Sequence, residues 1–160
     1  MSGPPPIDAR VQFIDAYVLR GDPQRPEVLV LRRGPGGRNA GAWETVHGSV
    51  EPGERPEQAA LRELREETGL APLRLYNASR VEAFYQHRTG EVALIPVFAA
   101  FVAGDADARL SAEHDRAEWL APAEALRRFA WPRERRALED VLALFCQGDG
   151  GLLDDVLRIC

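Results

Sequence analysis

The segment LRELREETGL, which starts at Leu61, is the feature that most restricts how this chain can fold. Pro56 fits the first position of a helix, and Gly69 fits the left-handed residue that commonly ends one. The residues between them recur at helical spacing, with one flank mostly apolar. We therefore predict a helix over residues 56–68 whose apolar flank faces a sheet.

Three glutamates of this helix, Glu63, Glu66 and Glu67, share a face, because residues three and four apart are neighbours on a helix. Each exposed like-charge pair costs roughly 0.2–0.5 kcal/mol. Two such charges about 5 Å apart repel by roughly 3 kcal/mol at an effective dielectric of about 20. Arg62 can relieve only part of this. The helix alone leaves two interpretations open: a solvated face, or a site for Mg²⁺ or Mn²⁺.

Composition indicates a single soluble domain. The chain has 160 residues, 45% of them hydrophobic, so folding requires neither disulfides nor a structural metal. A net charge of −5 without a basic stripe argues against a nucleic-acid polymer or a membrane as partner. The start MSGPPPIDAR lacks a secretory signal, so we expect a cytoplasmic protein. Cys146 and Cys160 should be free thiols.

Periodicity and turn residues divide the chain into short elements. The loop GPGGRNAG, Gly34–Gly41, suits a position beside a ligand. Residues 1–10 should form a flexible tail and residues 11–146 the domain, with 147–160 a tail that docks or joins a subunit contact. The expected strands are 11–19 and 27–33, paired as a hairpin, then 43–46, 81–85, 91–102 and 116–120, and the further helices are 122–129 and 133–145.

A longer pattern surrounds the acidic helix. Gly48 is followed after five residues by Glu54, and after seven more by the run RELREETGL from Arg62 to Leu70. This is the signature of the Nudix hydrolases, G-x5-E-x7-R-E-U-x-E-E-x-G-U with U aliphatic, matched at every fixed position. Such a pattern is far more specific than a short glycine motif and favours the metal site. The chain therefore resembles the Nudix hydrolase family.

The resemblance implies both a fold and a set of site residues. The fold would be α/β (α+β), an α/β/α sandwich around a mixed β-sheet. The cation would be Mg²⁺, for which Mn²⁺ can substitute. Its ligands would be Glu63, Glu66, Glu67 and the backbone carbonyl of His47, and the structural members of the motif would be Gly48, Glu54, Arg62 and Gly69, with Glu54 paired to Arg62.

The implied activity is Mg²⁺-dependent hydrolysis of a nucleoside triphosphate or dihydroneopterin triphosphate to monophosphate and pyrophosphate, by a monomer or homodimer acting on a small substrate. WETVHGSVEPGE and SAEHDRAEWL look most like the branch with dihydroneopterin triphosphate pyrophosphatase and dATP pyrophosphohydrolase-like members. Val46-His47 stands where many members that remove oxidised nucleotides have Pro-Gly, which argues against that role. The alternatives are hydrolysis of dinucleoside polyphosphates or nucleotide sugars, and a non-catalytic metabolite-binding domain.

The family mechanism needs a group that orients or deprotonates the attacking water. Glu66 or Glu67 would do so by the resemblance, although relatives also use a base on a distant loop. Glu113, which precedes a predicted strand, is our candidate for that loop base, and a solvated loop acid is the equal alternative. His114 is expected to make a local hydrogen bond rather than to catalyse.

Two further residues are candidates for substrate contacts. Arg32 and Arg33 end a strand before the glycine-rich loop, and alternation sends them to opposite faces, so at most one can meet phosphate. We favour Arg33. Trp43 could stack on a base or pterin, but an aromatic beside a strand is as often part of the core.

Overall fold

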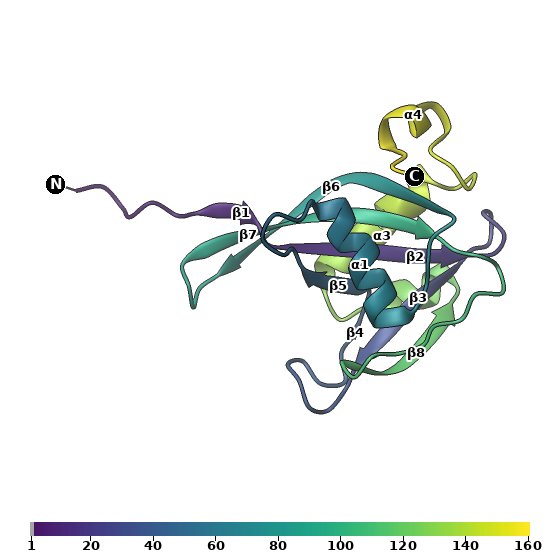
Figure 1. Cartoon of the computed structure of the whole chain (residues 1–160), viewed down its shortest axis with the longest axis horizontal. Helices are drawn as coiled ribbons and strands as arrows, with labels where there is room; N and C mark the ends of the chain where they lie inside the picture. Colours follow the sequence, from purple (N-terminus) through teal and green to yellow (C-terminus); the bar gives the residue numbers. More distant parts are fainter. Residues whose placement is uncertain (1) are drawn as a thin grey trace.

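In the computed structural model, which describes residues 2–160, strand β2 (Phe13–Arg20) is buried on both faces of the sheet. Ile14 and Val18 pack in a core cluster with helix α1 (Pro56–Thr68), while Tyr17 packs in a second cluster with helix α3 (Pro132–Leu144). Because neighbouring side chains of a strand point to opposite faces, the sheet lies between helices, with α1 in front of it in Figure 1. The predicted α/β/α sandwich with a mixed sheet is confirmed.

The sheet has eight strands, and its pairing mixes parallel and antiparallel neighbours. Strand β7 lies parallel to β1 and β2 and antiparallel to β6, while β3 is antiparallel to β2, β4 and β8, and β5 is antiparallel to β2. The predicted β2–β3 hairpin is therefore present. The remaining elements are β1 (Ala9–Val11), β3 (Glu27–Arg33), β4 (Trp43–Glu44), β5 (Val46–Ser49), β6 (Arg74–Gln86), β7 (Glu91–Phe101), β8 (His114–Leu120), α2 (Pro122–Arg128), the 3₁₀ turn η1 (Gly151–Leu153) and α4 (Asp154–Leu157).

Two predicted strands are each divided in the structure. The expected strand 11–19 breaks at Gln12, which separates β1 from β2, and β1 begins at Ala9, inside the range expected to be a flexible tail. It is held there by parallel pairing with β7, a long-range contact that local pattern does not reveal. The expected strand 43–46 breaks at Thr45, which separates β4 from β5.

Strand β6 was predicted too short at its N-terminal end. It starts at Arg74 rather than at residue 81, and its pairing with β7 slips between Asn77 and Val81. Ser79 has a φ of 55° at this bulge, a conformation uncommon for residues other than glycine. The bulge breaks the alternation of buried and exposed residues, which is why the pattern of the sequence hides this half of the strand.

Helix α1 has the predicted bounds, and its two ends have different supports. Arg55 stands at the N-cap and lacks the side-chain oxygen that is usual there. Its backbone N–H donates a hydrogen bond to the Oε1 of Gln58 at 3.0 Å. Gly69, with a φ of 70°, ends the helix. Glu67 lies among the buried residues of this helix, on the side that meets the sheet, rather than on the exposed face with Glu66.

The C-terminal segment docks on strand β6 (Figure 1). The hydroxyl of Tyr76 donates to Asp154 Oδ1 at 2.7 Å, and the N–H of Ile159 donates to the carbonyl of Leu75 at 2.8 Å. Leu157 is buried in the core cluster on the α3 side. Among residues 2–160, none of the helices combines the length and the apolar character needed to cross a membrane.

Candidate active site

Strand β5 and helix α1 approach so closely that only glycine fits between them. A Cβ added to Gly48 would lie 2.0 Å from Cδ of Glu63, well inside van der Waals contact. Val46 of the same strand is buried in one core cluster with Leu64 of the helix, which fixes the two elements together. The Glu63 side chain therefore lies against the backbone of β5, and the absence of a side chain at residue 48 makes its position possible.

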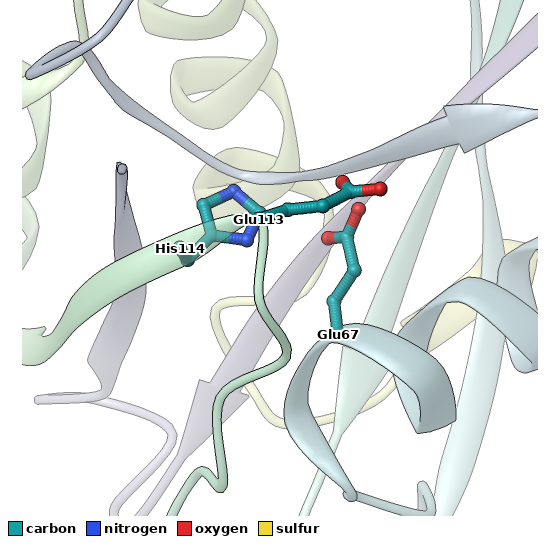
Figure 2. Close-up of side chains that lie close together, drawn as sticks. All are labelled: Glu67, Glu113 and His114. Atoms are coloured by element: carbon teal, nitrogen blue, oxygen red, sulfur yellow. The ribbon is translucent and has the colours of Figure 1, made fainter. Parts of the chain in front are cut away.

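A second acidic side chain approaches the helix from the loop before β8. Glu67, Glu113 and His114 each offer one ligand atom, and these atoms lie within 4.8 Å of one another. Figure 2 shows the Glu67 carboxylate, from the helix, pointing at that of Glu113, from the loop before β8. The N–H of Gly34 donates to the carbonyl of Glu113 at 2.9 Å and holds this loop against the end of β3.

The Glu67 carboxylate is buried among like charges. Glu67 is 3% exposed, and its Oε2 has no hydrogen-bond partner among residues 2–160. Burial, followed by repulsion from Glu63, Glu44 and Glu113, raises the pKa of Glu67 to about 9, against a smaller lowering effect from the backbone N–H of His47. Burial also raises the pKa of Glu63, although Arg62 opposes this. Glu67 thus lies among three other carboxyl groups, and one of its own oxygens has no partner within residues 2–160.

Arg62 is the cation that holds the motif together. Its Nε and Nη2 donate to the two oxygens of Glu54 at 2.8 and 2.9 Å, and Nη2 also donates to the carbonyl of Ser49 at 2.8 Å. The Arg62 hydrogen bonds hold the pKa of Glu54 at about 2. Nη1 reaches Glu63 at 2.8 Å and Glu66 at 3.2 Å, and Glu66 has a side chain 58% exposed. Glu54 and Arg62 thus join the loop to the helix.

The two predicted substrate contacts have protein partners in this structure. Arg33 donates from Nη1 to Glu44 Oε1 at 3.0 Å and from Nε to the carbonyl of Arg38 at 2.6 Å. Arg32 lies on the other side of the strand, where it pairs with Asp115, as alternation predicts. Trp43 packs against the core cluster on the α3 side, with the Arg128 guanidinium 4.6 Å from its ring centroid.

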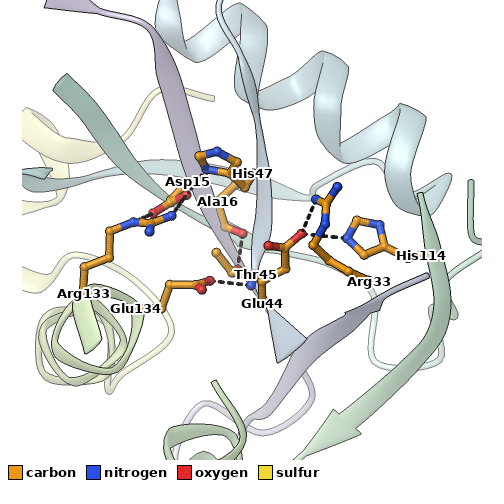
Figure 3. Close-up of polar contacts among 9 residues, drawn as sticks. All are labelled: Asp15, Ala16, Arg33, Glu44, Thr45, His47, His114, Arg133 and Glu134. Atoms are coloured by element: carbon orange, nitrogen blue, oxygen red, sulfur yellow. Dashed lines mark hydrogen bonds and ion pairs between the residues drawn. The ribbon is translucent and has the colours of Figure 1, made fainter. Parts of the chain in front are cut away.

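A polar network that the sequence did not predict surrounds strands β4 and β5 (Figure 3). Glu44 accepts a hydrogen bond from Arg33, and its Oε1 lies 3.0 Å from Nε2 of His114, which is 70 positions away, so this contact of His114 is not local in the sequence. His114 also belongs to the Glu67 group, a role not assigned to it from the sequence. The rest of the network joins residues far apart in the chain, so no local signal marks it; its members are Asp15, Thr45, His47, Arg133 and Glu134.

The donor set suits a hard divalent cation. Glu67 provides a buried oxygen without a partner, and Glu63 and Glu113 add carboxylates beside it. Carboxylate oxygens are the ligands that Mg²⁺ and Mn²⁺ prefer, and a bound cation would offset the repulsion that raises the pKa of Glu67. The residues present therefore fit the metal that the sequence motif implies.

Comparison with known proteins agrees with this arrangement. The NUDIX domain family matches residues 12–141. The chain is 34% identical over 119 residues to the CTP pyrophosphohydrolase of Escherichia coli K12, which covers 74% of this chain and 84% of that protein. It is 31% identical over 106 residues to the asymmetrical bis(5'-nucleosyl)-tetraphosphatase of Mus musculus, covering 65% and 72%.

Two further similarities concern a longer relative and a solved structure. An octanoyltransferase of Myxococcus xanthus is 35% identical over 151 residues, covering 89% of this chain, but this chain spans only 39% of that protein. The structure of the Escherichia coli dihydroneopterin triphosphate pyrophosphohydrolase superposes with a TM-score of 0.67 at 25% identity, covering 86% of this chain and 99% of that one. From the family match, these relatives and the fold, we conclude that the chain belongs to the Nudix family of hydrolases, which act on phosphoric anhydride bonds.

Proposed function

We propose that the protein is a Mg²⁺-dependent pyrophosphohydrolase that cleaves a nucleoside triphosphate, or dihydroneopterin triphosphate, to the monophosphate and pyrophosphate. The observation that carries this proposal is the buried Glu67 carboxylate, which has an unpaired oxygen and faces Glu113. Similarity to a CTP pyrophosphohydrolase and to a dihydroneopterin triphosphate pyrophosphohydrolase supports a triphosphate as substrate. We place the protein in the cytoplasm, where its two exposed free thiols, Cys146 and Cys160, would stay reduced.

The residues of the site divide into two proposed roles. Glu63, Glu66, Glu67 and the backbone carbonyl of His47 would hold Mg²⁺, or Mn²⁺ in its place. When bound, the cation would neutralise phosphate oxygens and lower the pKa of a water molecule. Glu113 lies on an exposed loop with its carboxylate beside that of Glu67, so it can take the proton of the attacking water as a general base.

A second candidate function is hydrolysis of dinucleoside polyphosphates. The 31% identity to the mouse asymmetrical bis(5'-nucleosyl)-tetraphosphatase supports it, and the same carboxylates would serve both reactions. The two functions differ in what lies beyond the cleaved phosphates, so substrate choice rests on residues outside the acidic cluster.

A product assay with Mg²⁺ tests the proposal. The panel contains nucleoside triphosphates, dihydroneopterin triphosphate, diadenosine tetraphosphate and ADP-ribose, and released pyrophosphate and phosphate are measured separately. We expect pyrophosphate from a triphosphate in the wild type and a loss of about 100-fold or more in kcat for Glu67→Gln. Preference for diadenosine tetraphosphate would favour the second function, and no turnover of any substrate would refute both. If Glu113→Gln turns over substrate at the wild-type rate, Glu113 is a solvated loop acid and not the general base.

A further inference from the structure

The break between strands β4 and β5 is stabilised by a side chain from another layer of the fold. At Thr45 the backbone N–H donates to the Oε2 of Glu134, which lies in the first turn of α3 (Figure 3). Both residues are fully buried, and 89 positions separate them in the chain. The carboxyl group of Glu134 therefore takes the place of a strand partner for this N–H.

Neighbouring residues of the same segment are held from the same side. The Oγ1 of Thr45 donates to the carbonyl of Ala16 at 2.6 Å, and the Nδ1 of His47 lies 2.7 Å from Oδ1 of Asp15. The Nε of Arg133, which precedes Glu134 in α3, donates to the other oxygen of Asp15 at 3.1 Å. The start of α3 thus anchors residues 45 to 47 directly and through strand β2.

The opposite side of this segment carries the acidic site. Gly48 is the position where β5 contacts the Glu63 side chain, and the backbone N–H of His47 is close enough to Glu67 to oppose the rise of its pKa. A shift of β5 by a fraction of an ångström would therefore move both carboxylates relative to the loop that carries Glu113.

Burial of the Glu134 carboxyl group is unfavourable for folding. The Oε1 of Glu134 has no hydrogen-bond partner among residues 2–160, and a buried polar atom without a partner is destabilising. An apolar side chain of the same size would avoid that cost. What the carboxyl group adds is an acceptor at the end of a side chain long enough to reach Thr45.

We propose that Glu134 is a positioning residue for the active site, acting through its bond to Thr45 to set the place of β5 against Glu63 and Glu67. The inference rests on the proposed function only in taking those carboxylates as the metal site. It assigns a role to a residue that lies outside the acidic cluster and acts through Thr45.

Three substitutions at Glu134 separate its hydrogen-bond acceptor from its acidic character and its volume. Glu134→Gln keeps the length and a carbonyl acceptor for the Thr45 N–H, Glu134→Asp keeps the acid but withdraws it by one methylene, and Glu134→Met keeps only the volume. The probe is Mn²⁺ alone, with its affinity measured by calorimetry without nucleotide. We expect affinity about 10-fold weaker in the Asp and Met variants and within twofold of wild type in the Gln variant.

Hydrogen exchange at the Thr45 amide provides a second readout that needs no metal. Exchange should accelerate in the Asp and Met variants but not in the Gln variant. The matched control is Val141→Ala, a buried core change on the same helix, which should lower the melting temperature without weakening Mn²⁺ binding. If the Met variant does not fold, the Asp and Gln variants decide the question alone.

Several results would overturn the proposal. Wild-type Mn²⁺ affinity in the Asp and Met variants, equal loss in the Gln variant, or equal loss in Val141→Ala would each do so. A wild-type protein that binds Mn²⁺ but hydrolyses no member of the substrate panel would refute the proposed function alone. A wild-type protein that takes up no Mn²⁺ would refute both.

Discussion

The three glutamates of α1 occupy three different environments. Glu66 is largely exposed and pairs with Arg62, Glu63 lies against β5, and Glu67 is buried opposite Glu113. The same chemical group thus has a different degree of burial and different neighbours at each position. Of the three, Glu67 is the one whose charge state the fold controls most strongly, because burial and three neighbouring carboxylates act on it together.

The raised pKa of Glu67 predicts a pH dependence of stability in the metal-free protein. Between the ordinary pKa of 4.5 and about 9, the folded state holds a proton that the unfolded chain has lost. The stabilising contribution is therefore complete below pH 4.5 and declines as pH rises toward 9, by up to about 1.4 kcal/mol per pH unit. Glu67→Gln should flatten this decline and be more stable than wild type at pH 8.

Urea unfolding in the presence of EDTA at pH 6, 7 and 8 measures this effect. The matched control is Glu66→Gln, which removes an exposed acid from the same helix. If the wild type and Glu67→Gln lose free energy of unfolding at the same rate with rising pH, the protonation of Glu67 in the folded state is contradicted.

A methyl group at residue 48 should disturb the acidic site directly. In Gly48→Ala the new Cβ would meet the Glu63 side chain, so that carboxylate must move away from β5. We expect a folded protein with Mg²⁺-dependent kcat lower by about 10-fold or more. Gly36→Ala is the control, since a Cβ there has nothing within 4 Å. Equal activities of the two variants would show that the close approach is not needed.

The sequence predicted the types of residue in the site better than their surroundings. The spacing of Glu63, Glu66 and Glu67 and the pairing of Glu54 with Arg62 follow from helix geometry and the family motif. The burial of Glu67 depends on where β5 and the loop before β8 lie, and these contacts join segments far apart in the chain. The Glu134 bond to Thr45 is of the same kind and left no trace in the sequence.

At the scale of elements, the loop between β5 and α1 has almost no secondary structure of its own and depends on one guanidinium. Arg62 binds both oxygens of Glu54 and the carbonyl of Ser49, so it spans the loop from its start to its end. Arginine suits this role because its planar fork offers several donors in fixed directions.

Arg62→Lys should therefore loosen the loop while keeping the positive charge. A lysine ammonium cannot reach Glu54 with two parallel bonds and Ser49 as well, so we expect a loss of about 1–2 kcal/mol in the free energy of unfolding. Faster hydrogen exchange at Glu54 and Glu51 should accompany it. Arg65→Lys, on the exposed side of the same helix, should leave both quantities unchanged. If both substitutions behave alike, the fork is not what holds the loop.

Regular elements were the most predictable part of the fold. The bounds of α1 followed from Pro56 and Gly69, and α3 followed from its apolar spacing. The errors fall where non-local pairing decides: β1 exists because β7 lies beside it, and the first half of β6 continues past a bulge that interrupts its alternation. Such pairings depend on where distant strands lie, which the alternation of residues within one segment does not reveal.

At the scale of the whole molecule, the C-terminal segment closes over the α3 side of the fold. Leu157 is buried, and Asp154 accepts a hydrogen bond from the Tyr76 hydroxyl. The backbone carbonyl of Cys160 accepts a hydrogen bond from the N–H of Leu75 at 3.0 Å. These contacts tie the end of the chain to β6 and to the core around α3, while the described acidic site is formed by α1, β5 and the loop before β8.

Removal of residues 149–160 should therefore lower stability more than activity. The loss of Leu157 burial is worth about 2 kcal/mol, which corresponds to a melting temperature lower by about 4–8 °C for a domain of this size. Turnover per folded molecule at 20 °C should stay within twofold of the full chain. Thermal melts and a matched Leu157→Ala variant of the full chain measure the two effects. Loss of turnover without loss of stability would instead connect the tail to the site.

The docked tail has a further consequence for how the protein behaves in concentrated solution. Within residues 2–160, one side of strand β6 pairs with β7, and the backbone of residues 158–160 occupies part of its other side beside Leu75 and Tyr76. Open strand edges recruit strands from other molecules and lead to aggregation. Residues 158–160 thus cover part of the open edge of β6. Their removal would expose that edge and favour filaments or precipitates.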